Sequence, residues 1–143
     1  MSFGALVSRQ SSSSCCRRGG GGGFLNNYYD DEGWWALAWI AAYEETNSAQ
    51  YLNMAEQIFA DMTTGWDSSC SGGIWWNKNR TYKNAIANEL FLSVAASLAA
   101  RTSATVQASD LAWAQKEWTW FSASGMINSQ NLIKRRTQFL LPE

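Results

Sequence analysis

Two adjacent carboxylates, Asp30 and Asp31, are the residues of this sequence best suited to acid and base chemistry. They lie among aromatic residues, in the stretch Tyr28-Tyr29-Asp30-Asp31-Glu32-Gly33-Trp34-Trp35. Burying a carboxylate against aromatic surface is unfavourable unless the group is paired, hydrogen-bonded or protonated. The pattern therefore indicates a pair of carboxyl groups that take part in proton transfer.

The same pair also fits the start of a helix. Aspartates are favoured at a helix N-cap and in the first turn, where free N–H groups and the helix dipole stabilise negative charge. Helical periodicity begins at Gly33, two residues after Asp31. Capping and catalysis are compatible, because a helix N-terminus would keep one of two neighbouring carboxylates charged.

Composition limits the classes of function. The net charge of −1 predicts no general affinity for nucleic acid, and no apolar run approaches the roughly 18 residues of a membrane span. There is no His, and Cys15, Cys16 and Cys70 show no metal-ligand spacing, so neither a metal site nor a cofactor is expected. Aromatic residues make up 14% of the chain, and tryptophan faces suit the C–H faces of sugars.

The elements that must position the aspartates are predicted to be helices, with no strand of any length. The first helix, from Gly33, is expected to be apolar on more than one face and to lie inside the fold. Its predicted buried face consists of Trp34, Leu37, Ala38, Ala41 and Ala42. A second, amphipathic helix follows Asn47-Ser48, ends at Gly65 and is predicted to lie outside. Its expected buried residues are Tyr51, Met54, Ala55, Ile58, Phe59 and Met62.

Two further helices are predicted after a long connection. One runs from about Asn84 to Ala100, and its expected buried face is Ile86, Ala87, Leu90, Phe91, Val94, Ala95 and Leu98. The other runs from about Val106 to Ala123 and is expected to use Leu111, Ala114, Trp118 and Phe121, with Trp113 and Trp120 beside them. The connection, residues 66–83, is rich in Gly, Ser and Asn but also in Trp. Long loops with many aromatic residues usually either pack under the domain or have a function. The short link within each helix pair and the long connection between the pairs predict stacked helical hairpins.

The ends of the chain differ from the middle. Residues 1–24 are rich in Ser and Gly and are predicted to be disordered, and their short apolar run does not resemble a secretory signal. Residues 25–132 are predicted to form one helical domain. The last residues, 133–143, are expected to be a solvated tail.

Three blocks in order resemble glycoside hydrolase family 76, especially its fungal members. They are the Tyr28–Trp39 stretch, Gly72-Gly73-Ile74-Trp75-Trp76, and Tyr82-Lys83-Asn84-Ala85-Ile86-Ala87-Asn88-Glu89-Leu90-Phe91. The resemblance, over about residues 25–132, implies an all-α, (α/α)6 barrel of helical hairpins, of which this chain supplies about four of the twelve helices. It also implies endo-acting hydrolysis of α-1,6-mannan, as in secreted or cell-wall-anchored fungal mannosidases. The residues after 132 do not continue the likeness.

By this resemblance Asp30 is the nucleophile and Asp31 the acid/base. Retaining hydrolysis needs carboxyl groups roughly 5–5.5 Å apart, which neighbouring residues with Cα atoms about 3.8 Å apart can provide. Inversion, with carboxyl groups roughly 6.5–9.5 Å apart, fits less easily.

Substrate contacts are expected from aromatic and amide side chains. The expected residues are Tyr29, Trp34, Trp35, Trp75, Trp76, Asn84 and Asn88. Adjacent tryptophans cannot face the same way, so each Trp pair is expected to give one sugar platform and one core residue. Asn84 and Asn88 fit either sugar hydroxyls or a hydrogen-bonded helix edge.

Two functions from different classes follow. The first is a truncated α-1,6-mannan hydrolase that binds the polysaccharide, with activity questioned by the missing helices. The alternative is a non-catalytic helical module that binds mannan or a protein partner through its Trp-rich surface.

Overall fold

The computed structural model of the chain describes residues 24–134. Within them lie four α-helices, α1 (Tyr29–Thr46), α2 (Ala49–Thr63), α3 (Ala85–Ala99) and α4 (Ala104–Ala123), and a single 3-10 turn, η1 (Ser69–Ser71). β-Pairing in this range is limited to isolated bridges. The prediction of an all-α protein with four helices is therefore confirmed. The predictions for residues 1–23 and 135–143 lie outside the described part of the chain.

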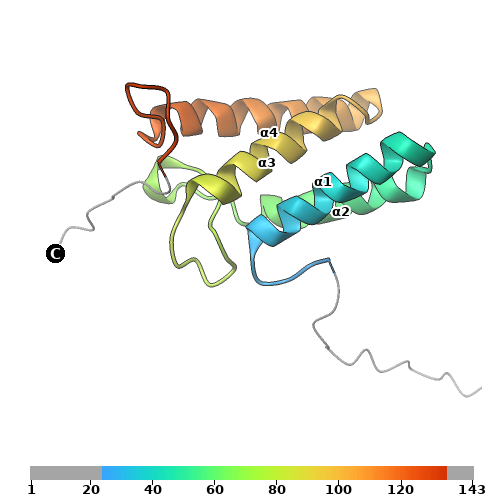
Figure 1. Cartoon of the computed structure of the whole chain (residues 1–143), viewed down its shortest axis with the longest axis horizontal. Helices are drawn as coiled ribbons and strands as arrows, with labels where there is room; N and C mark the ends of the chain where they lie inside the picture. Colours follow the sequence, from blue (N-terminus) through green and yellow to red (C-terminus); the bar gives the residue numbers. More distant parts are fainter. Residues whose placement is uncertain (1–23, 135–143) are drawn as a thin grey trace, which may run out of the picture.

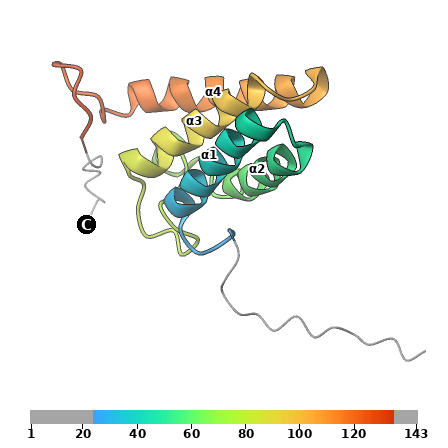
Figure 2. The same cartoon turned by 45° about the vertical axis from the view of Figure 1, so that its right-hand side comes forward.

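The helices form two hairpins that pack side by side (Figure 1). α1 pairs with α2 and α3 with α4, and the two hairpins meet mainly through α1 and α3. Both α1 and α3 begin at the end of the molecule that carries the long connection between α2 and α3, as the turned view also shows (Figure 2). The N-terminal ends of these two helices and this connection therefore share one end of the fold.

The predicted buried faces of α2 and α3 are largely confirmed. The core includes Ala55, Ile58, Phe59 and Met62 from α2. From α3 it includes Ala87, Phe91, Val94, Ala95 and Leu98. Ile86 is an exception, because 38% of its surface is exposed.

The predicted buried face of α1 is wrong apart from Leu37, which is partly buried against the core. The helix begins at Tyr29, one turn earlier than predicted, and its buried residues are Tyr29, Glu32, Gly33, Ala36 and Ile40. At Gly33, a Cβ atom would lie 2.7 Å from the Cβ of Leu90, so the helix buries its small residues where α1 crosses closely over α3. As a result, Trp34 and Trp35 point away from the core and are 58% and 46% exposed.

The predicted buried face of α4 is also wrong in part. Ala114 and Phe121 are buried as expected, but Leu111 and Trp118 are 47% and 53% exposed. The helix instead buries Asp110, Glu117 and Trp120. A helix with apolar residues around most of its circumference gives no clear signal of which side faces the core.

Candidate active site

Asp30 and Asp31 lie in the first turn of α1, where Tyr28 is the N-cap. Asp30 is half-buried and Asp31 is exposed. The Oδ1 atom of Asp30 accepts a hydrogen bond of 3.1 Å from the backbone N–H of Asp31. The N-terminal end of the helix favours negative charge at both positions.

Trp76, in the long segment between α2 and α3, forms a hydrogen bond with Asp30. Its indole Nε1 donates a hydrogen bond of 2.8 Å to Oδ2 of Asp30. The ring centroid of Trp76 lies 4.9 Å from that of Tyr28 and 5.0 Å from that of Tyr82. The backbone is fixed as well, because the N–H of Tyr29 donates to the carbonyl of Trp76 at 3.0 Å. Trp76 therefore contacts two tyrosine rings and directs its donor at one carboxylate.

A pocket of about 470 Å³ opens beside this pair. It lies between the N-terminal ends of α1 and α3 and is lined by Asp30, Trp76, Tyr82, Asn84, Ala85, Ile86, Glu89 and Ile133. The lining combines aromatic rings, short apolar side chains, an amide and carboxyl groups. This mixture can bind the C–H face of a sugar ring and its hydroxyl groups together.

Glu32, on the buried side of the first turn of α1, holds this turn through hydrogen bonds. Its carboxyl is fully buried, and Oε1 accepts hydrogen bonds of 2.9 Å from both the backbone N–H of Asn26 and Nζ of Lys78. Lys78 also lies 2.6 Å from Oδ2 of Asp61 on α2. Burial raises the pKa of Glu32 to about 7, although the hydrogen bond from Lys78 acts in the opposite direction. Glu32 thereby ties the entry segment, α2 and the long connection to the helix that carries the aspartates.

Asn84 and Asn88 both serve the fold. Asn84 is the N-cap of α3, and its Oδ1 accepts a bond of 3.1 Å from the N–H of Ala87, while its side chain also lines the pocket. Asn88 is fully buried and exchanges hydrogen bonds of 2.8 and 3.1 Å with the backbone N–H and carbonyl of Ile74. A further bond of 2.6 Å runs from its Nδ2 to the carbonyl of Asn84. Of the two alternatives for Asn88, the structure shows the hydrogen-bonded helix edge, because its amide group is occupied by backbone partners.

Tyr29 is also a core residue here. It is 4% exposed, and its hydroxyl lies 3.2 Å from Oγ1 of Thr64. A Cβ atom at Gly65 would lie 2.5 Å from its ring. The expected contact of Tyr29 with substrate is therefore not available in this structure.

Only one of the two adjacent tryptophan pairs supplies both a residue packed against the core and a residue in the pocket. Trp75 packs against the main core and donates a bond of 2.7 Å to Oδ2 of Asp67, whereas Trp76 lines the pocket. Trp34 and Trp35 are both exposed, so the expectation that one of them is a core residue is wrong. Trp35 contacts Phe24 edge to face at 4.9 Å, and neither residue of this pair lines the pocket.

A buried lysine that the sequence patterns did not indicate shapes the long connection. Nζ of Lys83 lies 2.8 Å from Oδ1 of Asp67 and from the carbonyl oxygens of Ser69 and Gly72. Burial alone would raise the pKa of Asp67, but the bonds from Lys83 and Trp75 lower it to about 2. Lys83 stands in the third block of the family resemblance, but that block does not indicate its partners, because most of them are backbone carbonyls that any sequence supplies.

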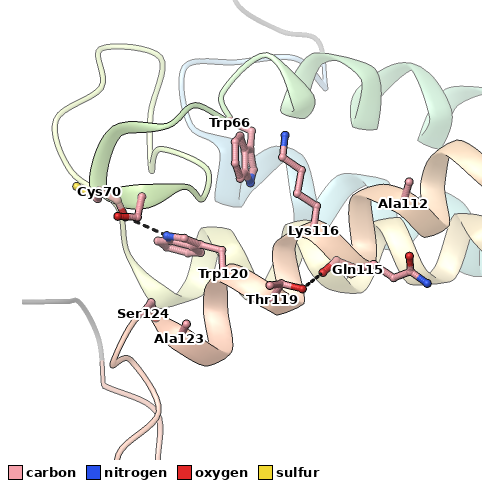
Figure 3. A pocket seen from close by; sticks show the side chains of 10 residues that line it. Trp66, Cys70, Ala112, Gln115, Lys116, Thr119, Trp120, Ala123 and Ser124 are labelled. Atoms are coloured by element: carbon pink, nitrogen blue, oxygen red, sulfur yellow. Dashed lines mark hydrogen bonds between the residues drawn. The ribbon is translucent and has the colours of Figure 1, made fainter.

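A larger pocket of about 760 Å³ lies between α4 and the start of the long connection, which contributes Trp66, Cys70 and Ser71 (Figure 3). There Nζ of Lys116 lies 3.4 Å from the ring centroid of Trp66, and the indole of Trp120 donates a bond of 3.0 Å to the carbonyl of Cys70. The indole of Trp66 donates to the buried Glu117 at 2.9 Å. Burial raises the pKa of Glu117 to about 7. None of the residues that line this pocket lines the pocket at Asp30.

Residues 24–134 contain no group of three or more His, Cys, Asp or Glu that could hold a metal ion. Over the same range, no helix has the length and apolar character needed to cross a membrane.

Comparison with known proteins gives consistent matches. The chain is 33% identical to a mannan endo-1,6-alpha-mannosidase of Candida albicans over 109 residues, which make up 68% of this chain and 24% of that protein. It is 31% identical to a mannan endo-1,6-alpha-mannosidase of Saccharomyces cerevisiae over 107 residues, 66% of this chain and 23% of that protein. The chain therefore spans about a quarter of the length of these curated relatives.

Solved structures share the fold. A protein of Listeria innocua matches with a TM-score of 0.75 and 27% identity over 84% of this chain and 34% of its own. An α-1,6-mannanase of Salegentibacter sp., an inactive variant with two consecutive aspartates replaced by asparagine, is bound to α-1,6-mannotriose. It matches with a TM-score of 0.69 and 25% identity over 77% of this chain and 32% of its own. The four helices thus form part of the (α/α)6 fold. A model of glycosyl hydrolase family 76 matches residues 20–136, and the chain belongs to that family.

Proposed function

We propose that this chain carries the catalytic carboxyl pair of a retaining hydrolase of α-1,6-linked mannan, with Asp30 as the nucleophile and Asp31 as the acid/base. The observation that carries the proposal is the position of Asp30, which lines a pocket while Trp76 donates a hydrogen bond to it. The relatives named as mannan endo-1,6-alpha-mannosidases, and the inactive mannanase variant that lacks two consecutive aspartates, support the assignment.

The geometry is compatible with two chemical steps. Asp30, fixed by the indole of Trp76, would attack the anomeric carbon and form a glycosyl ester while Asp31 protonates the departing sugar oxygen. Asp31, now a carboxylate, would then take a proton from water as that water cleaves the ester. The exposed position of Asp31 leaves it room to reach a leaving group and water.

A second candidate function rests on a different observation. Trp34 and Trp35 are exposed side by side on α1, outside the pocket at Asp30. Exposed neighbouring tryptophans can bind a polysaccharide or a protein partner without any reaction. A non-catalytic module that binds mannan would use this surface in place of the pocket.

Isothermal titration calorimetry of the full chain with α-1,6-mannotriose separates the two candidate functions. If the pocket is the binding site, Trp76→Ala weakens binding at least about tenfold, as expected for a sugar-stacking ring. The double variant Trp34→Ala, Trp35→Ala then binds as the unmodified chain does. The opposite pattern would assign binding to the exposed tryptophan surface and contradict the hydrolase proposal.

A further inference from the structure

Glu89 is a second carboxyl group in the wall of the pocket at Asp30. It comes from α3, five residues after the N-cap Asn84, whereas Asp30 comes from the first turn of α1. The pocket therefore has a carboxyl group on each of the two helices that form it. The motif resemblance assigned roles to the neighbouring Asn84 and Asn88 but none to Glu89.

The surroundings of Glu89 leave its carboxyl group free for a ligand. The side chain is half-buried, yet it makes no hydrogen bond or ion pair within residues 24–134. Burial raises the pKa of Glu89, and no charged or hydrogen-bonding group counteracts that effect. By contrast, the buried Glu32 is bonded to Lys78, and Glu117 to Trp66. No contact with the other described residues therefore gives the Glu89 carboxyl a role in the fold.

The chemistry of the pocket indicates what Glu89 would bind. Trp76 and Tyr82 supply aromatic surface, while Ala85, Ile86 and Ile133 supply apolar surface. Asp30 adds a second carboxyl, and this excess of negative charge disfavours an anionic ligand. A neutral sugar meets all of these conditions, because its hydroxyl groups donate to carboxylates and its C–H face packs against an aromatic ring.

We propose that Glu89 is a substrate-contacting residue that accepts hydrogen bonds from hydroxyl groups of the mannose unit bound beside Asp30. This inference rests on the proposed function and extends it from α1 to α3. A mannose unit would then be held between two carboxyl groups on neighbouring helices, with Trp76 beneath it. Glu89 would contribute to the recognition of the sugar, while Asp30 and Asp31 carry out the reaction.

The test uses the full chain and α-1,6-mannotriose as the ligand, with calorimetric titration of Glu89→Gln and Glu89→Ala. Glu89→Ala is expected to weaken binding about tenfold or more, and Glu89→Gln by less, since an amide oxygen still accepts a hydrogen bond. Neither substitution is expected to lower the thermal midpoint, because no protein partner is lost. The matched control is Glu56→Gln, which replaces another half-buried helical carboxyl away from this pocket.

The outcomes separate this inference from the proposed function. If Trp76→Ala weakens binding and Glu89→Ala binds within about twofold of the unmodified chain, the role of Glu89 is wrong and the pocket assignment stands. If the unmodified chain does not bind α-1,6-mannotriose, both are wrong. A lower thermal midpoint in both Glu89 variants would identify a structural role and overturn the inference.

Discussion

The indole Nε1 of Trp76 lies 2.8 Å from Oδ2 of Asp30, although 46 residues separate them in the chain. This contact joins the first turn of α1 to the connection between α2 and α3. It fixes one of two adjacent carboxylates and leaves the other, Asp31, exposed. Two residues of the same type thereby acquire different surroundings, which suits the different roles that a retaining mechanism requires.

Replacing Trp76 by Phe is expected to separate the ring contacts from the hydrogen bond. Phe keeps an aromatic ring in contact with Tyr28 and Tyr82 but removes the donor to Asp30. Hydrogen bonds to charged groups contribute about 1.5–3 kcal/mol, and less where water reaches them, so mannan hydrolysis should fall about tenfold. Kinetic assays on α-1,6-mannan measure this effect. A variant with unchanged kinetics would show that the contact with Asp30 has no role in the reaction.

Replacing Asn88 by Ala is expected to destabilise the fold. The change leaves the buried N–H and carbonyl of Ile74 without their side-chain partner, and each unsatisfied buried group costs about 1–3 kcal/mol. Denaturant unfolding monitored by circular dichroism measures the loss. Asn53→Ala, on the exposed face of α2, is the control and should change stability by less than about 0.5 kcal/mol. Equal effects at both positions would contradict the structural role of Asn88.

Gly33→Ala is expected to lower stability even though it improves helix propensity. Alanine in a helix is favoured over glycine by about 1 kcal/mol. The added Cβ atom would, however, lie 2.7 Å from the Cβ of Leu90, and overpacking of this kind costs about 1–3 kcal/mol. The sign of the change in unfolding free energy decides between the two effects. A more stable variant would contradict the close approach of α1 and α3.

Stability is expected to fall as pH rises from about 4.5 to about 7. Burial raises the pKa values of Glu32 and Glu117 from 4.5 to about 7, so the folded chain holds more protons than the unfolded chain in this interval. The stability that these protonated groups contribute is fully present below their pKa in the unfolded chain, 4.5. It is lost as the pH rises through their pKa in the folded chain, about 7. Thermal melts at several pH values measure the slope.

The variant Glu117→Gln isolates the contribution of one of these groups. A neutral amide cannot ionise, so the melting temperature of this variant should depend less on pH over the same interval. The lowered pKa of Asp67, about 2, acts mainly below pH 4 and leaves this interval unaffected. A slope in Glu117→Gln equal to that of the unmodified chain would show that Glu117 is ionised in the folded state throughout.

The sequence patterns predicted α2 well because this helix has one apolar and one polar face. They predicted α3 well because Glu89, Ser93 and Ser97 mark a narrow polar strip on an otherwise apolar helix. α1 and α4 were harder, since tryptophan and alanine surround most of each helix. The side that α1 buries is decided by Gly33 and Ala36, whose small size permits contact with α3. Periodicity gives weight to large apolar residues and therefore selected Trp34 and Leu111, which are exposed.

The residue pairs of the candidate site were visible in the sequence, but their contacts were not. Asp30 and Trp76 stand in separate motifs, and no local pattern indicates that one donates to the other. Asn88 stands in a motif that suggested sugar binding, yet its amide is bonded to the backbone of Ile74, which belongs to the preceding motif. Glu89 lines the pocket only because α3 begins beside α1, a relationship that arises from packing.

The most direct test of the aspartate pair is the release of reducing ends from unbranched α-1,6-mannan by the folded chain. We expect the unmodified chain to release reducing ends and Asp30→Asn and Asp31→Asn to release none, while both variants still bind α-1,6-mannotriose. Glu45→Gln, an exposed carboxyl at the far end of α1, is the control and should release sugar normally. Absence of release by the unmodified chain, or release that survives both aspartate substitutions, would contradict the account.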